Sequence, residues 1–99
     1  KVEEVTATGN YDGIGVISAN GSGLVRRNIV SFNGQDGIVA SGSTVTENVA
    51  NFNGRYGLNI NSGVFGSNTL DSNGLSNLLN NGAGAVSQGN NSCDSSLPC

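Results

Sequence analysis

The chain contains no histidine, no methionine and no tryptophan, and it has one proline and two cysteines. Without histidine, a Ser-His-Asp triad or a histidine metal site is excluded. Four basic residues against seven acidic ones give a net charge of −3, so we expect no nucleic-acid binding. No apolar run approaches the roughly 20 residues of a membrane-spanning helix. A length of 99 residues predicts one domain.

Small and polar residues dominate what remains, with 16 Gly, 16 Asn and 13 Ser. Such a composition suits a flexible segment. Disordered chains usually combine it with a high net charge and few large apolar residues. Here Leu, Ile, Val and Phe together fill 25 positions, so the decisive question is whether they recur regularly.

They recur at a fixed step along the chain. Asn-Gly pairs stand at 33–34, 53–54 and 73–74, and Asn28, Asn48 and Asn68 follow the same step. A fixed period near 20 indicates a solenoid. The apolar columns at this step are Val25, Val45 and Phe65; Phe32 and Phe52; and Ile38, Leu58 and Leu78.

The first repeat is longer, because Asp12 and Asp36 occupy matching places but lie further apart than the regular step. The small residues at 19–23 are the expected place for the four additional residues, since they have the composition of a loop.

The local pattern within a repeat is that of β-strands. Apolar and polar residues alternate in 43–47, 49–52 and 58–61, which predicts that Phe52 and Ile60 point inward. Gly and Asn lie between these runs and tolerate left-handed backbone angles at tight turns. Three short strands in each repeat describe one coil of an all-β parallel solenoid.

An antiparallel meander is the alternative, because Asn-Gly is a strong hairpin signal. A meander does not require identity at a fixed step, however. A parallel solenoid does, because each residue lies about 4.8 Å from its equivalent in the next coil. The repeat therefore favours the solenoid.

The runs 28–38 and 48–58 resemble the right-handed parallel β-helix repeats of the pectate-lyase-like superfamily. The resemblance covers about residues 4–90. It implies a right-handed parallel β-helix of about four coils, which we place at 1–91, followed by a capping tail at 92–99. That fold carries lyases, hydrolases, adhesins, tailspikes and structural modules, so the resemblance does not select a function.

The repeated asparagines are expected to have a structural role. An inward Asn at a turn has two amide donors and an acceptor, and a column of them bonds to itself and to the turn backbone. We therefore predict an asparagine ladder of Asn28, Asn48 and Asn68. The predicted stacked core consists of Val25, Val45, Phe65, Phe32, Phe52, Ile38, Leu58 and Leu78.

The two cysteines, Cys93 and Cys99, lie in the tail. A bridge between them would close a short loop over the last coil, and such bridges add about 2–3 kcal/mol. The alternative is half of a zinc site, which two cysteines without histidine do not complete. A bridge indicates an extracellular or cell-surface location.

Candidate chemistry is sparse. The resemblance implies that lyases of the superfamily cluster acids around calcium and use Arg or Lys as a base, but only Asp12 and Asp36 share a column here. We therefore expect no catalysis, no metal and no cofactor. Aromatic rings beside hydrogen-bonding groups suit sugar recognition, whereas the alternative reading is ordinary solvent-facing turn residues. The candidate glycan patch consists of Tyr11, Asp12, Asp36, Arg55 and Tyr56.

The sequence favours a non-catalytic extracellular structural module that assembles end to end. Lys1 to Val5 enter the repeat part-way through a coil, which suits either a subunit that stacks on another or a piece of a longer β-helix. The alternative function is the terminal piece of a carbohydrate-binding or polysaccharide-processing β-helix.

Overall fold

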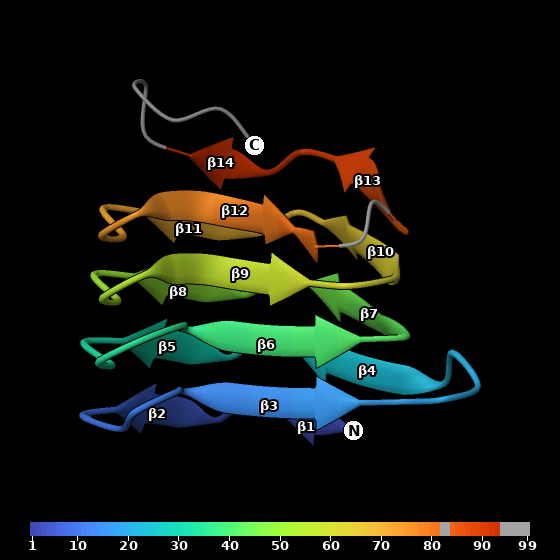
Figure 1. Ribbon diagram of the computed structural model, residues 1–99. Coiled ribbons are helices and arrows are strands. Elements are labelled where there is room, and N and C mark those ends of the chain that lie inside the picture. Colours follow the sequence, from blue (N-terminus) through green and yellow to red (C-terminus); the bar gives the residue numbers. More distant parts are fainter. Residues whose placement is uncertain (82–83, 94–99) are drawn as a thin grey trace.

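The chain winds into a stack of coils, each built from three short strands that meet at corners (Figure 1). The computed structural model describes residues 1–81 and 84–93. Equivalent strands of successive coils pair side by side, and every pairing between them is parallel. The protein is therefore an all-β parallel solenoid of about four coils.

Three sheets run along the stack. The first sheet consists of β1 (Val2–Glu3), β4 (Gly23–Arg26), β7 (Ser43–Thr46), β10 (Gly63–Gly66) and β13 (Ala85–Gly89). The second consists of β2 (Thr6–Thr8), β5 (Ile29–Ser31), β8 (Val49–Asn51), β11 (Thr69–Asp71) and β14 (Ser92–Cys93). The third consists of β3 (Ile14–Ile17), β6 (Ile38–Ser41), β9 (Tyr56–Ile60) and β12 (Ser76–Asn80).

The register reproduces the repeat step of the sequence. Val45 pairs with both Val25 and Phe65 in the first sheet, each one repeat step away. Leu58 pairs with Ile38 and Leu78 in the third. The predicted parallel stacking is confirmed, and the antiparallel meander is excluded for the described residues.

The first coil differs by a loop at 18–22 that projects from the stack. Ile17 pairs with Ser41 and Gly23 with Ser43, so five residues of the first coil stand where the second has Gly42 alone. The four additional residues predicted from the sequence lie in this loop.

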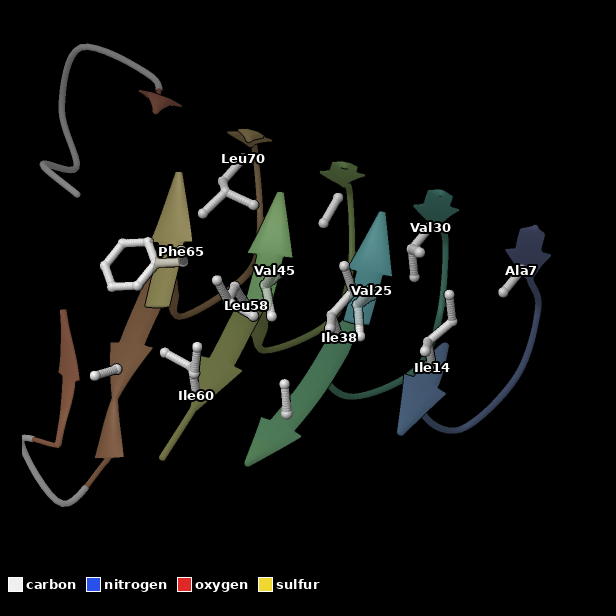
Figure 2. Packing of buried hydrophobic residues seen from close by; sticks show 13 residues of the cluster. Ala7, Ile14, Val25, Val30, Ile38, Val45, Leu58, Ile60, Phe65 and Leu70 are labelled. Atoms are coloured by element: carbon white, nitrogen blue, oxygen red, sulfur yellow. The ribbon is translucent and has the colours of Figure 1, made fainter. Parts of the chain in front are cut away.

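The core is a tube one side chain deep, into which inward residues of all three sheets project (Figure 2). Val25, Val45, Leu58 and Leu70 are fully buried. Leu78 is half-buried and packs against this cluster. Because the tube is narrow, each coil is covered mainly by the coils before and after it.

Phe32 and Phe52 stack on each other as predicted, but they do so outside the core. Their ring centroids lie 5.3 Å apart with an interplanar angle of 6°. The side chains are 66% and 53% exposed. Both residues have left-handed backbone angles, with φ of 56° and 57°, at a corner beyond the strand end. The inward and outward alternation of the strand stops there, so the prediction that these rings lie in the core is wrong.

The last coil extends slightly beyond the predicted boundary at residue 91. Strand β14 pairs Ser92 with Thr69 and Cys93 with Leu70. Cys99 lies outside the described residues, so its bridge to Cys93 stays a prediction. Within the described part of the chain, no helix is long and apolar enough to cross a membrane.

In the Asn-Gly pairs at 53–54 and 73–74, glycine follows asparagine because two backbones approach closely there. Gly34, Gly54 and Gly74 do not have positive φ. A Cβ atom on Gly54 would lie 2.1 Å from the carbonyl oxygen of Gly34, and one on Gly74 would lie 2.2 Å from that of Gly54. The requirement at Gly54 and Gly74 is space between coils, whereas a Cβ atom on Gly34 would lie 3.8 Å from the nearest atom, the carbonyl oxygen of Asn10.

We therefore expect Gly54→Ala to lower the free energy of unfolding by about 1–3 kcal/mol, since the new methyl group must push two coils apart. Gly15→Ala is the matched control, because a Cβ atom on Gly15 meets nothing within 4 Å. Urea denaturation of the two variants measures the difference. Equal stability of the two variants would contradict the close-approach explanation.

Candidate functional site

The best-defined constellation of polar side chains is a buried column of asparagines along one corner of the stack. Asn48 Nδ2 donates to Asn68 Oδ1 at 3.0 Å and to the carbonyl oxygen of Val25 at 2.9 Å. Asn48 Oδ1 accepts from the backbone amide and from Nδ2 of Asn28, at 3.0 and 2.9 Å. Asn68 continues the column by donating to Asn91 Oδ1 at 3.2 Å. The predicted asparagine ladder is present, and it gains Asn91 as a further member.

A second ladder runs along the next corner. Asn33 Nδ2 donates to Asn53 Oδ1 at 2.9 Å, and Asn53 Nδ2 donates to Asn73 Oδ1 at 3.0 Å. These are the asparagines of the three repeated Asn-Gly pairs, and each is at most 5% exposed. The sequence placed them at turns; the structure gives them the same buried role as the first ladder.

The second ladder also includes a bond between two residues of one coil. Asn73 Nδ2 donates to Asn77 Oδ1 at 2.9 Å. Asn77 follows Gly37 and Gly57 at the repeat step, and a Cβ atom on either glycine would lie within 2.7 Å of a ladder Nδ2 atom. Glycine thus makes room for the amide at 37 and 57, and asparagine supplies the acceptor for Asn73 at 77. The change from Gly to Asn at 77 was the sequence signal for this acceptor.

The residue before each ladder asparagine has a left-handed backbone. A non-glycine residue in that conformation costs about 1–2 kcal/mol. The turn places the following Asn side chain inward, where its hydrogen bonds compensate for the cost. The residues concerned, with φ between 53° and 59°, are Arg27, Glu47, Ser67 and Asn90 beside the first ladder and Phe32, Phe52 and Ser72 beside the second.

Asn48→Ala should lower the free energy of unfolding by about 3 kcal/mol or more, because each buried polar group left unpaired costs about 1–3 kcal/mol. The substitution leaves two donors of Asn28 without their acceptor, and Asn68 Oδ1 loses one of the two donors that Asn48 supplies. Asn61→Ala is the control, since Asn61 is exposed and its side chain makes no hydrogen bond within the described residues. Chemical denaturation checks this; a difference below about 0.5 kcal/mol would exclude a stabilising ladder.

The candidate glycan patch is only partly at the surface. Tyr11, Gln35 and Arg55 form one column. The Gln35 backbone amide donates to the Tyr11 backbone carbonyl at 2.7 Å, and the Arg55 backbone amide donates to the Gln35 backbone carbonyl at 2.9 Å. Tyr11 is 74% exposed. Tyr56 is half-buried, and the guanidinium carbon of Arg55 lies 5.4 Å from its ring centroid.

Asp36 does not belong to that exposed surface, and this part of the prediction is wrong. It is 4% exposed. Its Oδ1 accepts from the Tyr56 backbone amide at 3.3 Å and its Oδ2 from Asn59 Nδ2 at 3.0 Å. Asp12 is exposed, but its Oδ1 accepts from the Asp36 backbone amide at 3.1 Å. Both carboxylates therefore hold the corner backbone.

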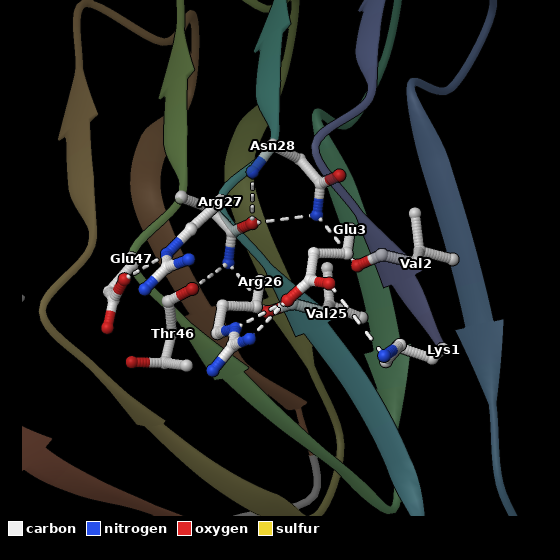
Figure 3. A network of polar contacts seen from close by, with 10 residues as sticks. Lys1, Val2, Glu3, Val25, Arg26, Arg27, Asn28, Thr46 and Glu47 are labelled. Carbon is white, nitrogen blue, oxygen red and sulfur yellow. Dashed lines mark hydrogen bonds and ion pairs between the residues drawn. The ribbon is translucent and has the colours of Figure 1, made fainter.

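Ion pairs link the first three coils on the outside of the stack (Figure 3). Glu3 pairs with Arg26, whose Nε donates to it at 2.7 Å, and Arg27 pairs with Glu47 at 2.8 Å. The hydrogen bond from Arg26 holds the pKa of the Glu3 carboxyl below its ordinary value of 4.5. A lowered carboxyl pKa stabilises the fold at neutral pH, and this contribution is lost as the pH falls through the folded-state pKa.

A shallow groove of about 350 Å³ lies between the 18–22 loop and strands β7 and β10. Its lining includes Ser18, Thr44, Ser62 and Val64, and none of its lining residues is titratable. Serine hydroxyls without an adjacent base are weak nucleophiles. Among the residues that the structure describes, no group of three or more His, Cys, Asp or Glu side chains is placed to hold a metal ion.

No protein-family model matches the chain, and no curated protein or solved structure matches it.

Proposed function

We propose that this protein is a non-catalytic structural module of the extracellular space or cell surface, which assembles by stacking coil on coil with another β-solenoid. We further propose that its coils are right-handed, as in the pectate-lyase-like superfamily. The handedness is supported by the strong preference of parallel β-crossovers for the right-handed connection.

The observation that carries this proposal is the incomplete cover of the core at the first coil. Val2 and Val16 are half-buried, whereas their equivalents Val25 and Ala40 in the second coil are at most 1% exposed. Each coil of this narrow tube is covered by its neighbours. A further coil stacked on the first would cover Val2 and Val16, as neighbouring coils cover Val25 and Ala40.

The edge strands of the first coil offer a matching set of backbone groups. The Ile14 and Ser18 amides donate to the second coil, at 2.9 Å each. Because successive amides of a strand point to opposite sides, those of Gly15 and Ile17 face away from it. An open edge of this kind is a template for another strand. The partner is a second copy of the chain or a coil of a longer β-helix.

The engagement of the acidic side chains supports a non-catalytic role. Asp12 and Asp36 hold the backbone, and Glu3 and Glu47 are paired with arginines. No described pair of carboxylates lines the groove.

A bridge between Cys93 and Cys99 would cover the opposite end of the stack. Peptide mapping without reductant tests this bridge, and unlinked peptides would exclude it.

Sedimentation velocity over a concentration series tests the stacking. We expect larger species as the concentration rises, and electron microscopy should show rods. Gly15→Pro removes an edge amide donor that faces away from the second coil, so it should reduce assembly, whereas Gly15→Ala should not. A chain that stays monomeric throughout the series, or that assembles equally well with Gly15→Pro, would contradict the proposal.

Carbohydrate recognition is the second candidate, and the high exposure of Tyr11 favours it. The exposed Tyr11 ring can lie against a sugar ring, and Asp12 and Arg55 supply hydrogen-bonding groups. A glycan-binding assay should lose its signal with Tyr11→Ala and keep it with Ile17→Ala, a similarly exposed apolar control. Absence of binding, or binding unchanged by Tyr11→Ala, would reject this function.

A further inference from the structure

The chain contains five Asn-Gly pairs, a dipeptide with a known chemical liability. The glycine amide nitrogen can attack the side-chain carbonyl carbon, Cγ, of the asparagine, and glycine offers no side chain to hinder the attack. Four of the five pairs lie fully within the described residues, at 20–21, 33–34, 53–54 and 73–74. Gly82 of the fifth pair lies outside them.

The ladders protect three of these pairs. The amides of Gly34, Gly54 and Gly74, which would be the attacking groups, donate to carbonyl oxygens of the preceding coil at 2.8, 2.9 and 2.9 Å. The asparagine side chains are buried and fixed by their own hydrogen bonds. Reaction at these pairs therefore requires the coil to open first.

Asn20 and Gly21 lack the burial and the backbone hydrogen bond that protect the ladder pairs. Both lie at the surface in the 18–22 loop. The Gly21 amide donates no hydrogen bond within the described part of the chain. A Cβ atom on Gly21 would meet nothing within 4 Å, and its φ is +78°, so the backbone here has room to rearrange.

The loop also activates the carbonyl group that would be attacked. Asn20 Oδ1 accepts from Ser22 Oγ at 2.6 Å, from Ser18 Oγ at 3.0 Å and from the Ser22 amide at 3.3 Å. When a nucleophile adds to Cγ, negative charge develops on this oxygen. Several donors around such an oxygen stabilise the tetrahedral intermediate, as an oxyanion hole does.

We infer that Asn20 is a site of spontaneous deamidation in the folded protein, and that the ladder asparagines are not. The Gly21 amide nitrogen loses its proton to hydroxide and bonds to Asn20 Cγ. The bond from Cγ to Nδ2 then breaks, and ammonia leaves with a proton from water. The product is a cyclic succinimide. Water adds to one of its two carbonyl carbons and opens the ring, which gives aspartate or isoaspartate without any oxidation or reduction.

Deamidation at Asn20 places a new negative charge beside the groove, whose lining includes Ser18 and Gly21. The same reaction in a ladder would have a different outcome. An aspartate there lacks the donors that the next coil needs and would bury a charge. A chain that stays unfolded for long therefore loses the ability to rebuild its ladders.

Trypsin separates the loop pair from the ladder pairs, because it cleaves after Lys1 and after the arginines at 26, 27 and 55. Residues 2–26 contain Asn20, and residues 28–55 contain Asn33 and Asn53. After incubation of the full chain in mildly alkaline buffer, mass spectrometry should find acid at Asn20 more than about tenfold faster than at Asn33 or Asn53, because the ladder must open before it reacts. In concentrated urea the three rates should converge. Equal rates in the folded protein, or an intact Asn20, would overturn the inference.

Substitution of the hydroxyl donors tests the activation of the carbonyl. Ser22→Ala combined with Ser18→Ala should slow the reaction at Asn20 severalfold in the folded protein and leave its rate in urea nearly unchanged. Circular dichroism checks that the variant keeps its fold. A rate that stays the same in the folded variant would exclude the assigned role of the two hydroxyls.

Discussion

The hydrogen bonds of the buried asparagine ladders are the constraint on which the other features of the structure depend. Each ladder Asn turns inward at a corner where the preceding residue has a left-handed backbone. Its amide satisfies a carbonyl oxygen and bonds to the next coil, and its Oδ1 accepts from the coil before it. The corners, the vertical register and the close approach of coils at the Asn-Gly glycines all follow from this arrangement. The apolar tube is too narrow to impose these by packing alone.

The ladders explain why a chain so rich in Gly and Asn folds. Glycine is retained where a Cβ atom would meet a backbone oxygen or a ladder amide, as at Gly54 and Gly57. The change to Asn77 supplies the acceptor for the side-chain amide of Asn73. The hydrogen bonds that stabilise the corners also fix the glycine amides and the asparagine side chains. They thereby hinder attack of the glycine nitrogen on the asparagine Cγ. Only in the projecting 18–22 loop, among the Asn-Gly pairs described in full, is that restraint absent.

The fold was predictable to the level of parallel coils because stacked residues repeat at the coil length. Identity at the repeat step gave the register of Val25, Val45 and Phe65 directly. Periodicity predicted side-chain direction less well at the corners, since the alternation of apolar and polar residues does not reveal where a strand ends. Phe32 and Phe52 fit the repeat, yet their rings lie outside the core. The ladder members Asn77 and Asn91 were missed because neither stands at the regular repeat step from the asparagine before it. The burial of Asp36 depends on contacts with Tyr56 and Asn59 that carry no sequence signature of their own.

A double-mutant cycle within one ladder tests the central role of these bonds most directly. The free energies of unfolding of Asn48→Ala, Asn68→Ala and the double variant give their coupling, with Asn48→Ala and Asn73→Ala on separate ladders as the reference. The ladder account predicts a coupling of about 0.5–3 kcal/mol for the first pair, because the two residues share a hydrogen bond, and near-additivity for the second. Additive effects within the first ladder would contradict it and would show that each asparagine acts only on its own corner.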